Sequence, residues 1–319
     1  MKTSFRFVIA AALLTLTSLV SPAAISRTIT VAQDGSGDYT TVGEALRKVR
    51  GDMDDTVRVF IKNGIYREKI VMNVTAQNVI VQGENPFKTI ITWDDYASRN
   101  NMGTSGSYTF KVEGNNITFS DLTFENAAGP VGQAVAVFTT GDCLRFVNCR
   151  FLGNQDTLYT GGRSSRLYFE NCYIEGTTDF IFGAATALFS GCEIHCKADS
   201  YITAASTSAT TPVGYVFHGC HITADPGVKE VYLGRPWRPN ASTYFIKCKM
   251  PAAIHPAGWH NWNNADNEKT ARYGEYGSYG PGASDSTRVA WRQQLTADDA
   301  AALVNPDSLF ARASSWRPY

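Results

Sequence analysis

Phe146-Val-Asn-Cys-Arg-Phe151 is followed 23 residues later by Phe169-Glu-Asn-Cys-Tyr-Ile174, and this repetition decides the fold. Both stretches fit one pattern: an aromatic residue, any residue, a small or polar residue, Cys or Leu, any residue, and an apolar residue. The pattern recurs at Phe119–Phe124, Phe146–Phe151, Phe169–Ile174, Phe189–Ile194, Phe217–Ile222 and Phe245–Met250. Its leading Phe residues are 20 to 28 residues apart, a period typical of solenoid proteins.

The residues between these repeats indicate strands and turns. Short runs of alternating apolar residues are separated by Gly and Asn. Leucine-rich repeats have a similar period, but they require a regular ladder of Leu and Asn, which this chain lacks. We therefore predict an all-β fold, a single-stranded right-handed parallel β-helix with short capping helices at its ends.

Two short segments have helical character. Thr41-Val-Gly-Glu44 fits a capping box and opens an apolar stripe that continues to Val49, which predicts a helix covering the N-terminal end of the solenoid. Thr296 begins a second short helix that ends before Pro306. Because no linker or change of composition divides the chain, we expect one domain over residues 25–319.

Composition excludes several classes of protein. The 319 residues include 29 basic and 29 acidic side chains, and 12% are aromatic. A neutral, aromatic-rich chain is not a disordered tail, and it has no basic excess for binding the backbone of a nucleic acid. The length is sufficient to bury a large core.

The first 24 residues have the features of a secretory signal peptide. Lys2 and Arg6 precede an apolar run over Phe7–Val20, and small residues follow at Ser21–Ala24. A membrane anchor is the alternative, but the run is shorter than the roughly 20 residues that a membrane span needs. We predict a cleaved signal, a secreted extracellular protein, and no membrane association.

Three Asn-x-Ser/Thr triplets, at Asn73, Asn116 and Asn240, would accept glycans in a eukaryotic host.

The chain has seven Cys residues, and five of them occupy the same position of the repeat: Cys149, Cys172, Cys192, Cys220 and Cys248. We expect these five to stack inside successive coils, about 4.8 Å apart. Buried free thiols are the favoured prediction. Disulfide bonds remain the alternative in a secreted protein, with local candidates in Cys143–Cys149 and Cys192–Cys196.

The same register brings two carboxylates together. Asp156 lies seven residues after Cys149, and Asp179 lies seven residues after Cys172. They should lie one above the other on the outer face, one strand spacing apart. Two carboxylates this close do not both ionise easily, so one would act as an acid and the other as a base or nucleophile. Asp199, seven residues after Cys192, would extend the row.

Several longer motifs follow one another along the chain: Gly64–Glu68, Thr123–Gly129, Gly132–Ala136, Gly153–Tyr159, Gly176–Gly183 and Tyr232–Trp237. In this order they resemble those of the pectin methylesterases (pectinesterases, carbohydrate esterase family 8). The resemblance extends from Ile29 to Trp291. It implies a parallel β-helix, the fold that the repeat predicts independently.

The resemblance also implies the roles of five residues. Asp179 matches the nucleophile, and Asp156 matches the general acid that later acts as a base. Gln133 and Gln155 match the amide donors that stabilise the oxyanion. Arg235 matches the residue that orients Asp179, and a guanidinium in that place would lower the pKa of the carboxyl group.

Further residues match positions that contact the substrate in the family. Tyr159, Phe180 and Trp237 match aromatic platforms for sugar rings, and Thr104 matches a threonine that contacts the substrate. Trp262 is a weaker match, because its loop varies within the family. Asp199 matches no functional residue, so we expect its role to be structural.

The implied activity is hydrolysis of methyl-esterified homogalacturonan (pectin) by a monomer, without a metal or organic cofactor. One alternative is another pectin-acting β-helical enzyme, a lyase or a polygalacturonase. A lyase of this shape would need a calcium cluster of acidic residues, and an inverting hydrolase would need carboxylates roughly 6.5–9.5 Å apart. A polysaccharide-binding relative that has lost catalysis is another alternative. No Gly-x-Ser-x-Gly motif supports a serine esterase.

Overall fold

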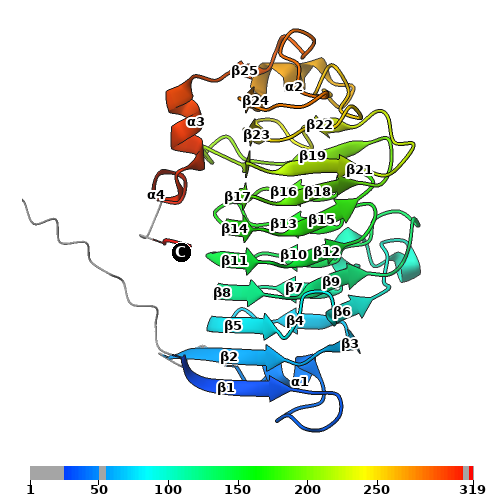
Figure 1. Ribbon diagram of the computed structural model, residues 1–319, viewed down its shortest axis with the longest axis vertical. Coiled ribbons are helices and arrows are strands. Elements are labelled where there is room, and N and C mark those ends of the chain that lie inside the picture. The colour runs from blue at the N-terminus through cyan, green and yellow to red at the C-terminus, as the bar shows by residue number, and fades with distance from the viewer. Residues whose placement is uncertain (1–24, 50–54, 312–315, 319) are drawn as a thin grey trace, which may run out of the picture.

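The computed structural model describes residues 25–49, 55–311 and 316–318, and the predicted signal peptide lies outside them. Three parallel sheets wind around one axis, and each complete coil contributes one strand to each sheet (Figure 1). The predicted parallel β-helix is confirmed. Among the described residues, no helix is long and apolar enough to span a membrane.

The strands of each sheet follow the order of the coils. The first sheet contains β1 (Ile25–Val31), β2 (Thr56–Ile61), β5 (Gln77–Gly83), β8 (Asn115–Ser120), β11 (Leu144–Val147), β14 (Arg166–Glu170), β17 (Thr186–Ser190), β20 (Tyr215–His218), β23 (Ser242–Ile246), β24 (Arg272–Tyr276) and β25 (Gln293–Gln294). The second contains β4 (Ile70–Met72), β7 (Phe110–Val112), β10 (Val137–Thr139), β13 (Leu158–Thr160), β16 (Ile181–Gly183), β19 (Tyr201–Ala205) and β22 (Tyr232–Gly234). The third contains β3 (Gly64–Arg67), β6 (Thr89–Trp93), β9 (Thr123–Asn126), β12 (Arg150–Leu152), β15 (Tyr173–Gly176), β18 (Glu193–Cys196) and β21 (His221–Ala224).

The sequence repeat marks the corner between the first and third sheets. Its Phe lies in a strand of the first sheet, and in the first five repeats its Cys or Leu immediately precedes a strand of the third sheet. The residue just before that Cys or Leu has a positive φ in all six repeats: Asp121 (57°), Asn148 (51°), Asn171 (51°), Gly191 (62°), Gly219 (61°) and Lys247 (52°). Gly, Asn and Asp tolerate this conformation best, which explains the small or polar residue in the pattern.

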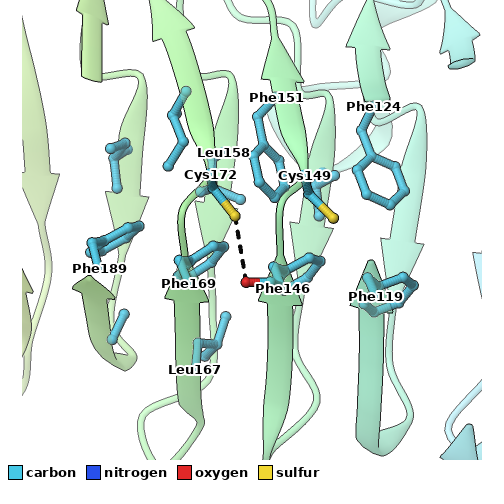
Figure 2. Close-up of a cluster of buried hydrophobic side chains, with 14 of the residues drawn as sticks. Phe119, Phe124, Phe146, Cys149, Phe151, Leu158, Leu167, Phe169, Cys172 and Phe189 are labelled. Atoms are coloured by element: carbon cyan, nitrogen blue, oxygen red, sulfur yellow. Dashed lines mark hydrogen bonds between the residues drawn. The ribbon is translucent and has the colours of Figure 1, made fainter. Parts of the chain in front are cut away.

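The leading Phe residues form a stack through the core (Figure 2). Neighbouring rings from Phe119 to Phe245 have centroids 4.8, 4.9, 4.5, 4.4 and 4.4 Å apart, and interplanar angles below 10°. Each of these side chains is fully buried. The stack therefore ties successive coils together along the whole repeat.

All seven Cys residues are free, and only Cys143 is not buried. The Cys172 thiol donates a hydrogen bond to the carbonyl oxygen of Phe146 in the preceding coil, at 3.4 Å (Figure 2). Cys192 bonds in the same way to Phe169, at 3.6 Å. The prediction of buried free thiols is confirmed, and neither local disulfide is formed.

Helix α1 (Val42–Leu46) packs against β1 and β4 at the N-terminal end, as predicted. Its predicted capping box is wrong, because the hydroxyl of Thr41 bonds to the Glu44 side chain and caps no backbone group. The carboxylate of Glu68, from the β3–β4 turn, instead accepts hydrogen bonds from the N–H groups of Val42 and Gly43, both at 2.8 Å.

The C-terminal helices do not cover the end of the solenoid. Helix α3 (Ala297–Val304) begins with a complete capping box between Thr296 and Asp299. It is followed by α4 (Pro306–Leu309), and both lie along the flank of the first sheet (Figure 1), where Ala300 and Leu309 pack with Val216 of β20. The predicted short helix that starts at Thr296 and ends before Pro306 is confirmed, but it lies on a flank of the solenoid and not at an end.

The C-terminal end is closed by loops and by α2 (Ala265–Thr270) (Figure 1). The rings of Trp259 and Tyr273 lie 4.5 Å apart beneath them and are almost fully buried. Two short 3₁₀ helices, η1 (Arg99–Asn101) and η2 (Thr104–Gly106), lie in the long β6–β7 connection.

Candidate active site

The two aspartates lie just before neighbouring strands of the second sheet. Leu158, the first residue of β13, pairs with Ile181, the first residue of β16, so that Asp156 and Asp179, each two residues earlier in the chain, fall in register. Their backbone φ values are 65° and 49°. This left-handed conformation is uncommon outside glycine and often occurs at functional sites. The predicted stacking of the two carboxylates is confirmed.

Asp199 does not extend the row. Nine residues separate Cys149 from Leu158 and Cys172 from Ile181, whereas eleven separate Cys192 from Thr203, the partner of Ile181. The third position of the row is therefore taken by Tyr201, and its carbonyl oxygen accepts a hydrogen bond from the N–H of Asp179 at 2.8 Å.

The Asp199 carboxylate instead accepts hydrogen bonds from the N–H groups of Lys229 and Glu230, at 2.6 and 2.9 Å. The expectation of a structural role for Asp199 is confirmed.

Arg235 follows β22 and pairs with Asp179. Its Nε and Nη2 donate to the two carboxylate oxygens at 3.0 and 2.7 Å, a bidentate arrangement. Only 19% of the Arg235 side chain and 8% of the Asp179 side chain are exposed. Hydrogen bonds of this kind are strong because charge and planar geometry act together.

Burial raises the pKa of both carboxyl groups, and the charged groups beside them differ. The pKa of Asp156 rises to about 8, because burial and the neighbouring Asp179 charge outweigh a hydrogen bond from Gln133 and the Arg235 charge. Burial also raises the pKa of Asp179, and the hydrogen bonds and charge of Arg235 oppose that rise. Arg235 thus lowers the pKa of Asp179 as expected, but burial outweighs the guanidinium and the net shift is upward.

The order of the two pKa values follows from the position of Arg235. At neutral pH Asp156 is expected to hold a proton, while Asp179, the direct partner of Arg235, is expected to carry the negative charge. The pair thus offers one acid and one anion side by side.

Gln133 and Gln155 lie in adjacent coils, joined by an isolated parallel bridge. The side-chain amide of Gln133 hydrogen-bonds to Asp156. Both glutamines line the same cavity as the two aspartates. Two amide groups therefore lie beside the acid and the anion, where they can donate hydrogen bonds to an oxygen that becomes negatively charged.

This cavity has a volume of about 300 Å³. It is lined by Thr104, Ser105, Gln133, Phe138, Gln155, Asp156, Tyr159, Asp179, Phe182, Ala204, Arg235, Trp237 and Trp262. Aromatic rings continue along its floor, with centroids 4.2 Å apart for Phe138 and Tyr159 and 4.9 Å apart for Tyr159 and Phe182. Every residue that the sequence assigned to the site lines this cavity, except Phe180.

Phe180 is fully buried in the core, so its assignment to the substrate surface is wrong. Side chains alternate between the two faces of a strand, and Phe182 is the residue that reaches the cavity. The sequence contained a signal for this: Phe182 follows Asp179 by three residues, as Tyr159 follows Asp156. Phe138, the partner of Tyr159 in β10, was also missed.

Among the residues that the structure describes, no group of three or more His, Cys, Asp or Glu side chains could hold a metal ion.

Comparisons with known proteins agree on one family. A family model described as pectinesterase matches residues 28–309. Pectinesterase 31 of Arabidopsis thaliana is 41% identical over 295 residues, which cover 88% of this chain and 92% of the relative. The probable pectinesterase/pectinesterase inhibitor 23 of Arabidopsis thaliana is 35% identical, and the chain spans about half of that relative, 54%.

Solved structures give the same result. Pectin methylesterase from carrot is similar with a TM-score of 0.85 and 33% identity, covering 91% of this chain and 94% of that one. A pectin methylesterase in complex with hexasaccharide VII has a TM-score of 0.75 and 25% identity, covering 93% of this chain and 100% of that one.

Proposed function

Because the chain belongs to the pectinesterase family, we propose that it hydrolyses the methyl esters of homogalacturonan to give pectate and methanol. The observation that carries the proposal is the bidentate Arg235–Asp179 pair beside Asp156, whose pKa is raised to about 8. One cavity thus contains an anion, an acid and two amide donors, which ester hydrolysis by a carboxylate requires.

In the first half of the reaction, Asp179 attacks the carbonyl carbon of the methyl ester. The carbonyl oxygen becomes negatively charged, and the side-chain amides of Gln133 and Gln155 stabilise it. Asp156 then gives its proton to the departing methoxy group. Methanol leaves, and an acid anhydride joins Asp179 to the galacturonate.

In the second half, water attacks the carbonyl carbon of the galacturonate in that anhydride. Asp156, now ionised, removes a proton from the water and so regains the proton that it had lost. The bond to Asp179 breaks, the galacturonate leaves as a free acid, and the Asp179 carboxylate pairs again with Arg235. Both aspartates return to their starting protonation states.

The aromatic rings along the cavity floor suit a chain of sugar rings. Pyranose rings present C–H groups on their faces, and Tyr159, Phe182 and Trp237 would pack against them. The complex of a related pectin methylesterase with a hexasaccharide supports an oligosaccharide as the ligand. We further propose that the protein acts outside the cell, as a monomer, after removal of residues 1–24.

Methanol release and chain length, measured together on highly esterified pectin, test the proposal. Wild-type protein should release methanol without shortening the polymer, and Asp179→Ala should reduce the rate at least a thousandfold. Asp199→Asn is the matched control, because Asp199 lies outside the cavity, and it should retain wild-type activity. Full methanol release by Asp179→Ala would overturn the mechanism, and polymer cleavage would indicate a lyase or a polygalacturonase. Pectin binding without methanol release by the wild type would indicate a non-catalytic relative.

A further inference from the structure

The geometry points to Tyr201 as a positioning residue that holds the Arg235 guanidinium in the plane in which it pairs with Asp179. This inference rests on the proposed function, because it concerns how the nucleophile of that reaction is kept ionised and aligned. Tyr201 occupies the position that follows Asp156 and Asp179 in the outer row, one coil further on.

Two aromatic rings enclose the Arg235 guanidinium. Its Cζ lies 3.9 Å from the centroid of the Tyr201 ring and 3.7 Å from the centroid of the Trp262 ring. Two rings cannot both lie this close to one face of so small a group, so they cover opposite faces. Cation–π contacts of this kind contribute roughly 0.5–2 kcal/mol each.

A guanidinium group donates hydrogen bonds only in its own plane. With both faces covered by rings, Arg235 can turn only by pushing one of the rings aside. The edge formed by Nε and Nη2 is thereby kept toward the two oxygens of Asp179, at 3.0 and 2.7 Å. The rings therefore determine the direction of the ion pair as well as stabilising its cation.

Tyr201 is itself held by a column of rings in the following coils. Its ring stacks on Tyr232 at 5.4 Å, and Tyr232 stacks on His255 at 4.3 Å. His260 contacts both residues whose rings enclose Arg235. Its ring lies 5.4 Å from that of Tyr201, and its Nδ1 accepts a hydrogen bond from the N–H of Trp262 at 3.0 Å.

Of the two rings that enclose Arg235, only that of Trp262 lines the substrate cavity. Trp262 lines the cavity, so its removal would alter substrate contacts as well as Arg235. Tyr201 does not line it, so it acts only through its contacts with Arg235 and with the N–H of Asp179. A loss of Tyr201 should therefore lower kcat and leave KM nearly unchanged.

Loss of the ring should also change the acidity of the nucleophile. Arg235 opposes the rise in the pKa of Asp179 that burial causes. A guanidinium that is free to turn away would oppose it less, so the pKa of Asp179 would rise further. Since Asp179 must be ionised to attack, the acid limb of the activity profile would move to higher pH.

The experiment compares Tyr201→Leu, which removes the aromatic face, with Tyr201→Phe, which keeps it. Tyr201→Leu should lower kcat for methanol release about tenfold, the rate equivalent of one cation–π contact, with KM changed less than about twofold. Its acid limb should move to higher pH, and Tyr201→Phe should behave as the wild type does. Wild-type kcat and an unmoved acid limb in Tyr201→Leu would overturn the inference.

Tyr232→Leu is the matched control, because it removes the next ring of the column and not the one against Arg235. Its acid limb should stay at the wild-type pH. If both Leu variants lose equal activity and shift the limb equally, Tyr201 is only part of the scaffold and the inference fails.

An NMR titration of the Asp179 carboxyl group keeps this test separate from that of the proposed function. If the wild type releases no methanol, the proposed function fails. The inference still stands if the pKa of Asp179 rises in Tyr201→Leu, and it fails if that pKa is unchanged.

Discussion

Asp156 and Asp179 share a left-handed backbone and a buried position, but their surroundings differ in charge. Asp179 receives the Arg235 guanidinium, whereas Asp156 faces a second carboxylate. The burial that suits Asp156 to donate a proton also makes its ionised form unfavourable. Ionisation of Asp156 therefore destabilises the folded protein, and this destabilisation grows as the pH rises.

We predict that Asp156→Asn stabilises the folded protein above neutral pH. The pKa of Asp156 is about 8 in the folded chain and near 3.9 in an unfolded one, so its contribution to stability is complete below about pH 4 and is lost as the pH rises through 8. Asn resembles the protonated acid and tolerates the positive φ of this residue. Thermal unfolding should show a gain on the order of 1–3 kcal/mol at pH 8 and almost none at pH 4.

Asp179→Asn is the comparison for this prediction. Its free energy of unfolding at pH 8 should rise less than that of Asp156→Asn, because Asp179→Asn also removes the negative charge that Arg235 binds. An equal gain at pH 4 and pH 8 for Asp156→Asn would contradict the assigned pKa.

At the scale of the element, the corner between the first and third sheets repeats one left-handed residue. Asn, Asp or Gly fills it in five of the six repeats, and Lys247 fills it in the sixth. Gly277, with a φ of 63°, occupies the same corner in the following coil. Lys247 is exposed, so packing does not compensate for its unfavourable backbone.

Replacing Lys247 with Gly should stabilise the protein by about 0.5–1 kcal/mol. A left-handed backbone costs an ordinary L-residue roughly 1–2 kcal/mol, and Gly avoids this cost. Gly also loses more conformational entropy on folding than Lys does, which cancels part of the stabilisation. Urea denaturation measures the change. Asn171→Ala, at the same corner, should lower the stability of the protein. A loss of stability in Lys247→Gly would show that the left-handed backbone of Lys247 does not destabilise the folded protein.

The capping of α1 is also an element-scale feature. Local sequence suggested that Glu44 completes the cap, but Glu68 supplies it from the β3–β4 turn. Glu68 lies 26 and 25 residues from Val42 and Gly43 and becomes adjacent to them only after the coil has closed, so no local pattern could identify it.

For the molecule as a whole, the Phe stack passes through six successive coils and gives the solenoid a continuous core. Each coil contacts mainly its two neighbours, so stability depends on interfaces between adjacent coils. The ring of Phe189 lies 4.5 Å from that of Phe169 and 4.4 Å from that of Phe217. It belongs to two such interfaces.

Phe189→Ala should therefore destabilise the protein by about 3–5 kcal/mol, the usual cost of a large cavity in a core. Phe87→Ala is the control, because the Phe87 side chain is 66% exposed, and its effect should stay within about 0.5 kcal/mol. Chemical denaturation of the two variants makes the comparison. Similar losses in both would show that the stack is not the main source of stability.

The amino-acid sequence was enough to predict the solenoid, because a side chain that stacks on its counterpart one coil away recurs at a regular position. The Phe and Cys positions showed where each coil begins, and counting from Cys149 and Cys172 placed Asp156 beside Asp179. The same count failed at Asp199, since two additional residues lie between Cys192 and Thr203, the residue that pairs with Ile181.

Only the folded structure shows how deeply the two carboxyl groups are buried and which rings enclose their partner Arg235. Phe180 and Phe182 are both aromatic, and the pleat of the strand turns the first into the core and the second into the site. The high pKa of Asp156 and the enclosure of Arg235 by Tyr201 and Trp262 both come from packing between coils. Spacing along the chain sets register, whereas burial and ring contacts depend on loops whose lengths differ from coil to coil.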